Sequence, residues 1–127
     1  MKKQLSKSLI ERFSRQIILK NIGILGQKKI LLSKVLIVGV GGLGSPAAEF
    51  LVRSGVGLLG IIDYDKVSLS NLHRQSLYET SHVGKSKVQV IKKILNRINP
   101  NTKVQTYNLK LNDNNFKKII KKYDYII

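Results

Sequence analysis

The 127-residue chain has no cysteine, only two prolines, and seven acidic residues against 23 basic ones. The absence of cysteine excludes disulfides, a zinc site built on thiolates and a cysteine nucleophile within this sequence. It also fits a cytoplasmic protein. With so few prolines and no long tract of glycine and serine, the chain shows no linker. Its length is sufficient for one domain with a hydrophobic core.

Long hydrophobic runs are also missing. The N-terminal sequence MKKQLSKSLIERF has basic residues but no apolar segment of signal-peptide length. The longest stretch without a charged residue, 35–48, is too short and too rich in glycine to cross a bilayer. The sequence therefore predicts no association with a membrane.

The formal net charge of +16 comes mainly from lysine. Eighteen of the 23 basic residues are lysines spread along the whole chain, and the eight aromatic residues (five Tyr, three Phe) show no regular interleaving with them. A charge of this size raises nucleic-acid binding as a hypothesis. The scattered distribution favours a lysine-rich solvated surface instead, so we expect no nucleic-acid partner.

Strand and helix patterns alternate along the chain. Four segments have the apolar, β-branched character of buried strands: 34–38, 58–62, 104–109 and 125–127. Five segments have helical spacing or helix-start signals: 8–19, 27–33, about 45–54, 83 or 84 to 98, and 113–123. We expect Ser8 to cap the first helix and Asp113 the last. The alternation predicts an α/β fold with a Rossmann-like, doubly wound, mainly parallel sheet.

Two parts are distinguished, an N-terminal helical arm (1–33) and a Rossmann-like half-domain (34–127). In a doubly wound sheet with strand order 3-2-1-4, the fourth strand lies beside the first, in an interior position. The sequence ends within that apolar strand. We therefore expect the sheet to be truncated in or after the fourth strand. An open apolar edge would make the chain alone marginally stable and prone to aggregation.

A glycine-rich turn follows the first strand. Gly39, Gly41, Gly42 and Gly44 form a G-x-G-x-x-G pattern between strand and helix, and Asp63 comes nineteen residues after Gly44. Glycines let the backbone approach a phosphate closely, and the start of a helix offers unpaired N–H groups to an anion. Asp63 can accept hydrogen bonds from ribose hydroxyls. In this context the pattern predicts a nucleotide-binding site.

The pattern itself fits NAD, FAD, S-adenosylmethionine or ATP. The segment after Asp63 favours ATP, because Arg74 and Lys87 are suited to the charge that builds up when a carboxylate attacks the α-phosphorus. Asn71 is a candidate for a neutral hydrogen bond to the nucleotide. Asp65 is better explained as a structural loop residue than as half of a metal pair with Asp63. An NAD-binding Rossmann oxidoreductase remains the alternative, although it gives the two cations no role.

Four segments in this order and spacing resemble the ThiF/MoeB/HesA family of ubiquitin-activating-enzyme-like adenylyltransferases: ERFSRQIIL, VGVGGLGSPAAEFLVRSGVG, IDYDKVSLSNLHRQSLY and VGKSKV. The resemblance covers about residues 11–100. It implies an enzyme that binds Mg-ATP on a Rossmann-like fold. It further implies that this enzyme adenylates the C-terminal Gly-Gly carboxylate of a ubiquitin-fold sulfur carrier, as in molybdopterin or thiamine biosynthesis.

The resemblance also implies roles for single residues. Arg74 and Lys87 would act on the phosphates, and Arg15 would reach in trans into the partner's site of a homodimer. The glycine pattern and the resemblance together give the expected nucleotide contacts: Gly39, Gly41, Gly42, Gly44, Asp63, Ser70, Asn71, Leu72, His73, Arg74 and Lys87. We expect no metal ligand in this chain. In the family, an Asp that helps to hold Mg-ATP and the Cys pairs for zinc follow the fourth strand. The chain alone is therefore expected to be inactive, and the function to belong to its intact parent.

Overall fold

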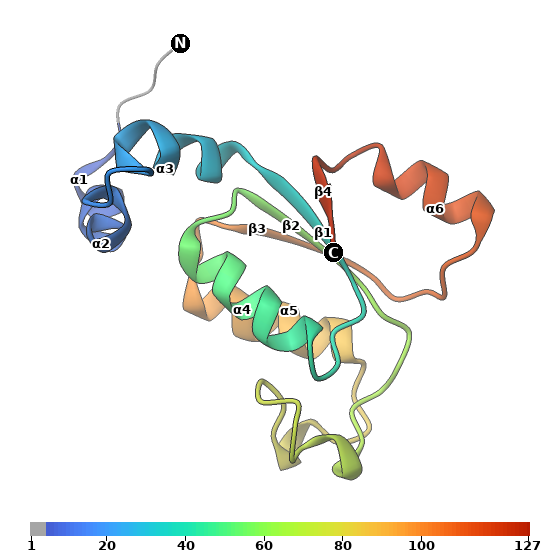
Figure 1. Cartoon of the computed structure of the whole chain (residues 1–127). Coiled ribbons are helices and arrows are strands. Elements are labelled where there is room, and N and C mark those ends of the chain that lie inside the picture. The colour runs from blue at the N-terminus through green and yellow to red at the C-terminus, as the bar shows by residue number, and fades with distance from the viewer. Residues whose placement is uncertain (1–4) are drawn as a thin grey trace.

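The computed structural model describes residues 5–127 (Figure 1). Its four strands are β1 (Lys34–Val38), β2 (Leu58–Ile62), β3 (Lys103–Tyr107) and β4 (Tyr125–Ile126). All pair in parallel, in the order β3-β2-β1-β4. The predicted α/β class and strand order are confirmed. Residues 1–4 of the predicted arm lie outside the described residues.

Helices cover both faces of the sheet. They are α1 (Lys7–Arg12), α2 (Ser14–Ile17), α3 (Gly23–Leu32), α4 (Gly44–Ser54), α5 (Lys87–Ile98) and α6 (Asp113–Ile120). Figure 1 shows α4 and α5 on one face of the sheet and α6 on the other. In β1, Val35 and Ile37 belong to the core under α4 and α5, whereas Leu36 packs with Ile119 of α6. Burial on both faces explains why this strand is continuously apolar.

The helix predicted over 8–19 is wrong in two respects. The structure breaks it at Phe13 into α1 and α2, and Ser6 caps it in place of Ser8, accepting a hydrogen bond from the N–H of Leu9 at 3.3 Å. Phe13 is buried to 1% exposure, and its ring lies so close to Gly55 that a Cβ there would collide with it. The helix is thus interrupted at the residue whose ring packs against the end of α4.

Three other helix starts differ from the prediction. The helix predicted over 27–33 is α3, which begins four residues earlier, at Gly23. Asn112, not Asp113, caps α6, and its side chain accepts hydrogen bonds from two backbone N–H groups. The fourth predicted helix begins at Lys87, because the residues before it are engaged elsewhere. The N–H of Gly84 donates to the Val67 carbonyl, and the N–H of Val67 donates to the Lys85 carbonyl. This pairing keeps 84–86 out of the helix.

The N-terminal helices are fastened to the C-terminal end of α4. The side-chain amides of Gln16 and Gln27 both donate to the backbone carbonyl of Ser54, at 3.1 and 3.0 Å. Gln16 also donates to Gln27 at 2.7 Å. Because the glycine turn is at the other end of α4, this contact places the arm away from it.

β4 forms one edge of the sheet. The N–H of Ile127 donates to the Leu36 carbonyl, and the Ile127 carbonyl accepts from Val38, both at 2.8 Å. Within residues 5–127 no strand pairs with the outer side of β4, and Tyr125, Ile126 and Ile127 are exposed. None of the described helices is long and apolar enough to cross a membrane.

Candidate nucleotide site

The turn between β1 and α4 requires glycine at two positions. Gly39 has a φ of +92°, a left-handed conformation that favours glycine. At Gly44 a Cβ would collide with the carbonyl oxygen of Gly39, so the turn closes only without a side chain there. The N–H of Gly39 donates to the Ile62 carbonyl at 2.7 Å and so continues the pairing of β1 with β2. The glycine loop, defined here as residues 39–44, thus starts at the carboxyl end of the sheet.

The second half of this loop presents unpaired backbone donors. In the part of the chain that the structure describes, the N–H groups of Gly41, Gly42, Leu43 and Gly44 make no hydrogen bond. They lie at the N-terminus of α4, where the helix dipole adds positive potential. Such an arrangement binds a phosphate or another anion.

Asp63 ties the end of β2 to the glycine loop. One carboxylate oxygen accepts the N–H of Val40 at 2.9 Å, and the other accepts the N–H of Asp65 at 2.8 Å. Each oxygen keeps a free lone pair, so the carboxylate can also accept a ribose hydroxyl. Beside it lies a cleft of about 410 Å³, lined by Val38, Gly39, Ile62, Asp63, Tyr64, Asp65, Leu109, Lys110 and Leu111.

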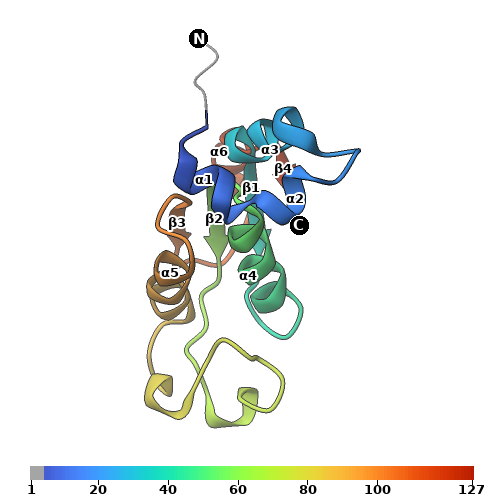
Figure 2. The same ribbon diagram turned by 90° about the vertical axis from the view of Figure 1, so that its left-hand side faces the viewer.

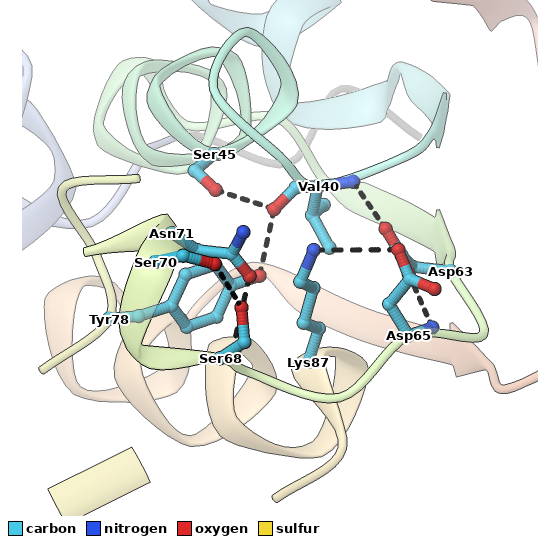
Figure 3. Close-up of polar contacts among 9 residues, drawn as sticks. All are labelled: Val40, Ser45, Asp63, Asp65, Ser68, Ser70, Asn71, Tyr78 and Lys87. Atoms are coloured by element: carbon cyan, nitrogen blue, oxygen red, sulfur yellow. Dashed lines mark hydrogen bonds and ion pairs between the residues drawn. The ribbon is translucent and has the colours of Figure 1, made fainter. Parts of the chain in front are cut away.

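Lys87 is the first residue of α5 and is 5% exposed. Its ammonium nitrogen lies 3.6 Å from a carboxylate oxygen of Asp65. Figure 3 shows this ammonium pointing toward Val40 of the glycine loop. A buried ammonium needs a charged partner, and Asp65 supplies one while leaving further N–H donors available.

The connection from β2 to α5 extends beyond the carboxyl ends of the strands, as Figure 2 shows. In it, Asn71 closes a 3₁₀ turn (Leu69–Asn71) by accepting the N–H of Ser68 at 3.2 Å. Arg74 follows, and its guanidinium donates to the Ser70 carbonyl at 3.1 Å. A Cβ on Gly42 would lie 3.9 Å from the side-chain carbons of Arg74. The arginine therefore lies against the glycine loop.

Residues 13–127 match the ThiF family. The chain belongs to the ThiF family. It is 42% identical over 124 residues to the adenylyltransferase and sulfurtransferase MOCS3 of Aedes aegypti, covering 98% of this chain and 28% of that protein. It is 40% identical over 122 residues to the sulfur carrier protein adenylyltransferase of Thermus thermophilus, covering 96% and 45%. The family resemblance found in the sequence is confirmed.

A solved structure of E. coli tRNA N6-threonylcarbamoyladenosine dehydratase, TcdA, in complex with AMP is similar as well, with a TM-score of 0.86. The identity is 27%, and the match covers 98% of this chain and 50% of that one. That structurally similar protein thus binds an adenine nucleotide. This chain spans between about a quarter and a half of the length of the proteins it matches.

The ThiF-family chain brings most of the predicted site residues together, but not all of them. Ser70 and His73 are exposed, with a ring nitrogen of His73 3.0 Å from the Ser70 carbonyl. The side chain of Leu72 packs against the main core, which leaves its backbone for any contact with a nucleotide. Arg15 is exposed on α2, whose neighbouring Gln16 contacts the far end of α4. Within one chain, Arg15 is therefore remote from the glycine loop.

Sequence reasoning missed three residues around this ThiF-family loop, Ser45, Tyr78 and Gln75, and expected for Asp65 only a structural role in its loop. Asp65 pairs with Lys87. Ser45 and Tyr78 both donate to the Val40 carbonyl, at 2.7 and 2.9 Å. Gln75 is 3% exposed, with its side-chain nitrogen 3.5 Å from where a Cβ of Gly41 would lie. Ser45 directly follows the glycines, which is the one local signal that would have marked it.

Proposed function

We propose that this chain is the nucleotide-binding part of an enzyme that uses ATP to adenylate the C-terminal Gly-Gly carboxylate of a ubiquitin-like sulfur-carrier protein. One observation carries the proposal: Arg74 lies against the glycine loop and the ammonium of Lys87, at the start of α5, points toward Val40 of that loop. Within residues 5–127, four backbone N–H groups of the same loop are unpaired. A dinucleotide oxidoreductase has no use for two cations there. The relatives named as adenylyltransferases support the same reaction.

The proposed roles follow from this geometry. ATP, when bound, supplies the adenylyl group: the carboxylate oxygen bonds to the α-phosphorus as the bond to pyrophosphate breaks. The loop N–H groups and Lys87 hold the phosphates and offset the charge that develops on their oxygens. The guanidinium of Arg74 is held in place by the Ser70 carbonyl and also offsets the charge on the phosphate oxygens. Asp63 positions the ribose.

We propose that Mg²⁺ enters with ATP. Among residues 5–127 there is no group of three or more His, Asp or Glu side chains that could hold a metal ion alone. The phosphates would therefore provide most of its ligands. Asp65, which pairs with Lys87, would offset part of the positive charge beside them. In this proposal residues 34–127 are the ATP-binding half-domain and residues 1–33 the helical arm of a cytoplasmic enzyme.

The proposal includes a homodimer in which Arg15 enters the partner's site. α4 has eleven residues, which corresponds to about 16 Å along its axis. The arm is bonded to one end of α4 and the glycine loop lies at the other. An arginine side chain does not span that length, so Arg15 can act on phosphates only from a second chain.

The test is pyrophosphate exchange into ATP. This chain would replace the equivalent segment of the Thermus thermophilus relative, and exchange would be measured with a ubiquitin-fold carrier ending in Gly-Gly. We expect exchange that depends on the carrier and is strongly reduced by Arg74→Ala or Lys87→Ala. Arg53→Ala, at an exposed surface pair with Glu49, is the matched control and should leave exchange unchanged. Exchange that survives the Lys87 and Arg74 substitutions would refute the assigned roles.

A further inference from the structure

Both polar groups of the Val40 backbone are fixed by other residues. Its N–H donates to Asp63, and its carbonyl accepts two hydroxyl hydrogen bonds, from Ser45 at 2.7 Å and Tyr78 at 2.9 Å. Figure 3 shows the two hydroxyl groups converging on this one carbonyl oxygen. Ser45 is fully buried and Tyr78 is 5% exposed, so water does not compete for either bond. The peptide between Val40 and Gly41 is therefore held in one orientation.

That orientation decides where the first free donor of the loop points. In a planar trans peptide the C=O of one residue and the N–H of the next point in opposite directions. Because Ser45 and Tyr78 hold the Val40 carbonyl inward, the N–H of Gly41 is turned outward, away from these buried hydroxyl groups. Resting on the function proposed above, we propose that Tyr78 and Ser45 are positioning residues for phosphate binding.

The glycine pattern makes such a restraint necessary. Gly41 has no Cβ, and the nearest atom to a Cβ placed there is the side-chain nitrogen of Gln75 at 3.5 Å, so backbone sterics alone do little to prevent a peptide flip. A flipped peptide would present the negative end of the Val40 carbonyl to the phosphates and withdraw one donor. The flexibility that admits a phosphate is thus restrained by two hydroxyl groups. One of them, Tyr78, lies 38 residues further along the chain.

The chain offers a matched control in Tyr123. Its hydroxyl also bonds to a single partner, Tyr107, at 3.0 Å, and its ring lies so close to Gly60 that a Cβ there would collide with it. It belongs to the smaller core cluster on the other face of the sheet, with Leu36 and Ile119. Tyr123→Phe therefore removes the same atom as Tyr78→Phe without touching the glycine loop.

The experiment measures the dissociation constants of ATP, inorganic tripolyphosphate and adenosine for the full chain and its variants. We expect Tyr78→Phe to weaken the binding of ATP and of tripolyphosphate by about three- to tenfold, the effect of one hydrogen bond. The binding of adenosine should be unchanged. Ser45→Ala should act in the same way, and it carries the test if Tyr78→Phe does not fold. In the double variant, the affinity for ATP should fall by a larger factor than the product of the two single-variant factors, because the buried Val40 carbonyl then has no partner.

A spectroscopic readout separates positioning from general destabilisation. The carbonyl carbon resonance of Val40 should move in Tyr78→Phe and stay in place in Tyr123→Phe. Equal losses of affinity in the two phenylalanine variants, an equal loss for adenosine, or no loss at all would overturn the inference while leaving the proposed function intact. A wild-type chain that binds neither ATP nor tripolyphosphate would instead refute the proposed function and this inference with it.

Discussion

The carboxylate of Asp63 accepts a hydrogen bond from the backbone N–H of Val40 at 2.9 Å, across 23 residues of sequence. Parallel pairing of β1 and β2 places these residues side by side at the carboxyl ends of the two strands. The acid that the sequence pattern assigns to the ribose therefore also holds the glycine loop. Its removal should affect both the stability of the chain and its binding of nucleotide.

Asp63→Ala leaves two backbone N–H groups, those of Val40 and Asp65, without their acceptor. We expect the free energy of unfolding to fall by about 1–3 kcal/mol, because two hydrogen bonds of about 0.5–1.5 kcal/mol each are lost. Urea denaturation measures this. Glu11→Ala, at an exposed position of α1, is the control and should change the value by less than about 0.5 kcal/mol. Equal effects of the two substitutions would show that the Asp63 contacts do not stabilise the loop.

Two glycines of the loop should respond differently to alanine. At Gly44 the added Cβ meets the backbone carbonyl of Gly39, so we expect Gly44→Ala to lose more than about 3 kcal/mol of stability or to fail to fold. At Gly42 the nearest atoms are side-chain carbons of Arg74 at 3.9 Å, an ordinary contact. The melting temperature of Gly42→Ala should therefore be close to that of the wild type, but this variant should bind ATP more weakly. Thermal melting and ATP titration of both variants check this, and a Gly44→Ala chain with wild-type melting would contradict it.

Alkaline pH should destabilise the chain through its buried tyrosines. Burial raises the pKa of Tyr78 above the ordinary value of 10.0, and burial together with the hydrogen bond to Tyr107 raises the pKa of Tyr123. A raised tyrosine pKa means that the fold favours the neutral phenol. Its stabilising effect is present below about pH 10 and is lost as pH rises further, because the unfolded chain then ionises first.

The measurement is the free energy of unfolding between about pH 9 and pH 11.5. Tyr78→Phe should make its fall with pH shallower by at most about 1.4 kcal/mol per pH unit, the contribution of one titrating group. Tyr64→Phe is the control, because Tyr64 is 58% exposed. Identical slopes in the wild type and Tyr78→Phe would contradict the burial of this phenol.

The limits of β1 and β2 could be predicted to the residue, because KVLIV and LLGII are apolar runs bounded by polar residues or glycine. The break at Phe13 could not, since it depends on contact with Gly55 at the end of α4. The start of α5 was misplaced for a similar reason. Pairing of residues 84–86 with 66–67 is a contact between segments, and it leaves no periodicity in either one.

In the candidate site, too, some residues could be predicted from the sequence and others depend on contacts that only the fold creates. Spacing and the family resemblance pointed to the glycines, Asp63, Arg74 and Lys87. The ion pair of Lys87 with Asp65 and the bond from Tyr78 to Val40 were not foreseen, because each joins residues that only the folded sheet brings together. Local patterns show which residue types suit a phosphate. They do not show which residues hold those groups in place.

Titration of the chain with ATP, comparing Lys87→Ala with Lys85→Ala, shows whether Lys87 holds the nucleotide at the glycine loop. Both lysines lie in the segment VGKSKV, but Lys87 is buried beside the glycine loop, whereas Lys85 is exposed. We predict that Lys87→Ala weakens ATP binding at least about tenfold, the effect of losing a charge-assisted hydrogen bond, and that Lys85→Ala changes it less than about twofold. Equal affinities in the two variants, or binding of NADH that ATP does not displace, would show that this loop and Lys87 do not form an ATP site.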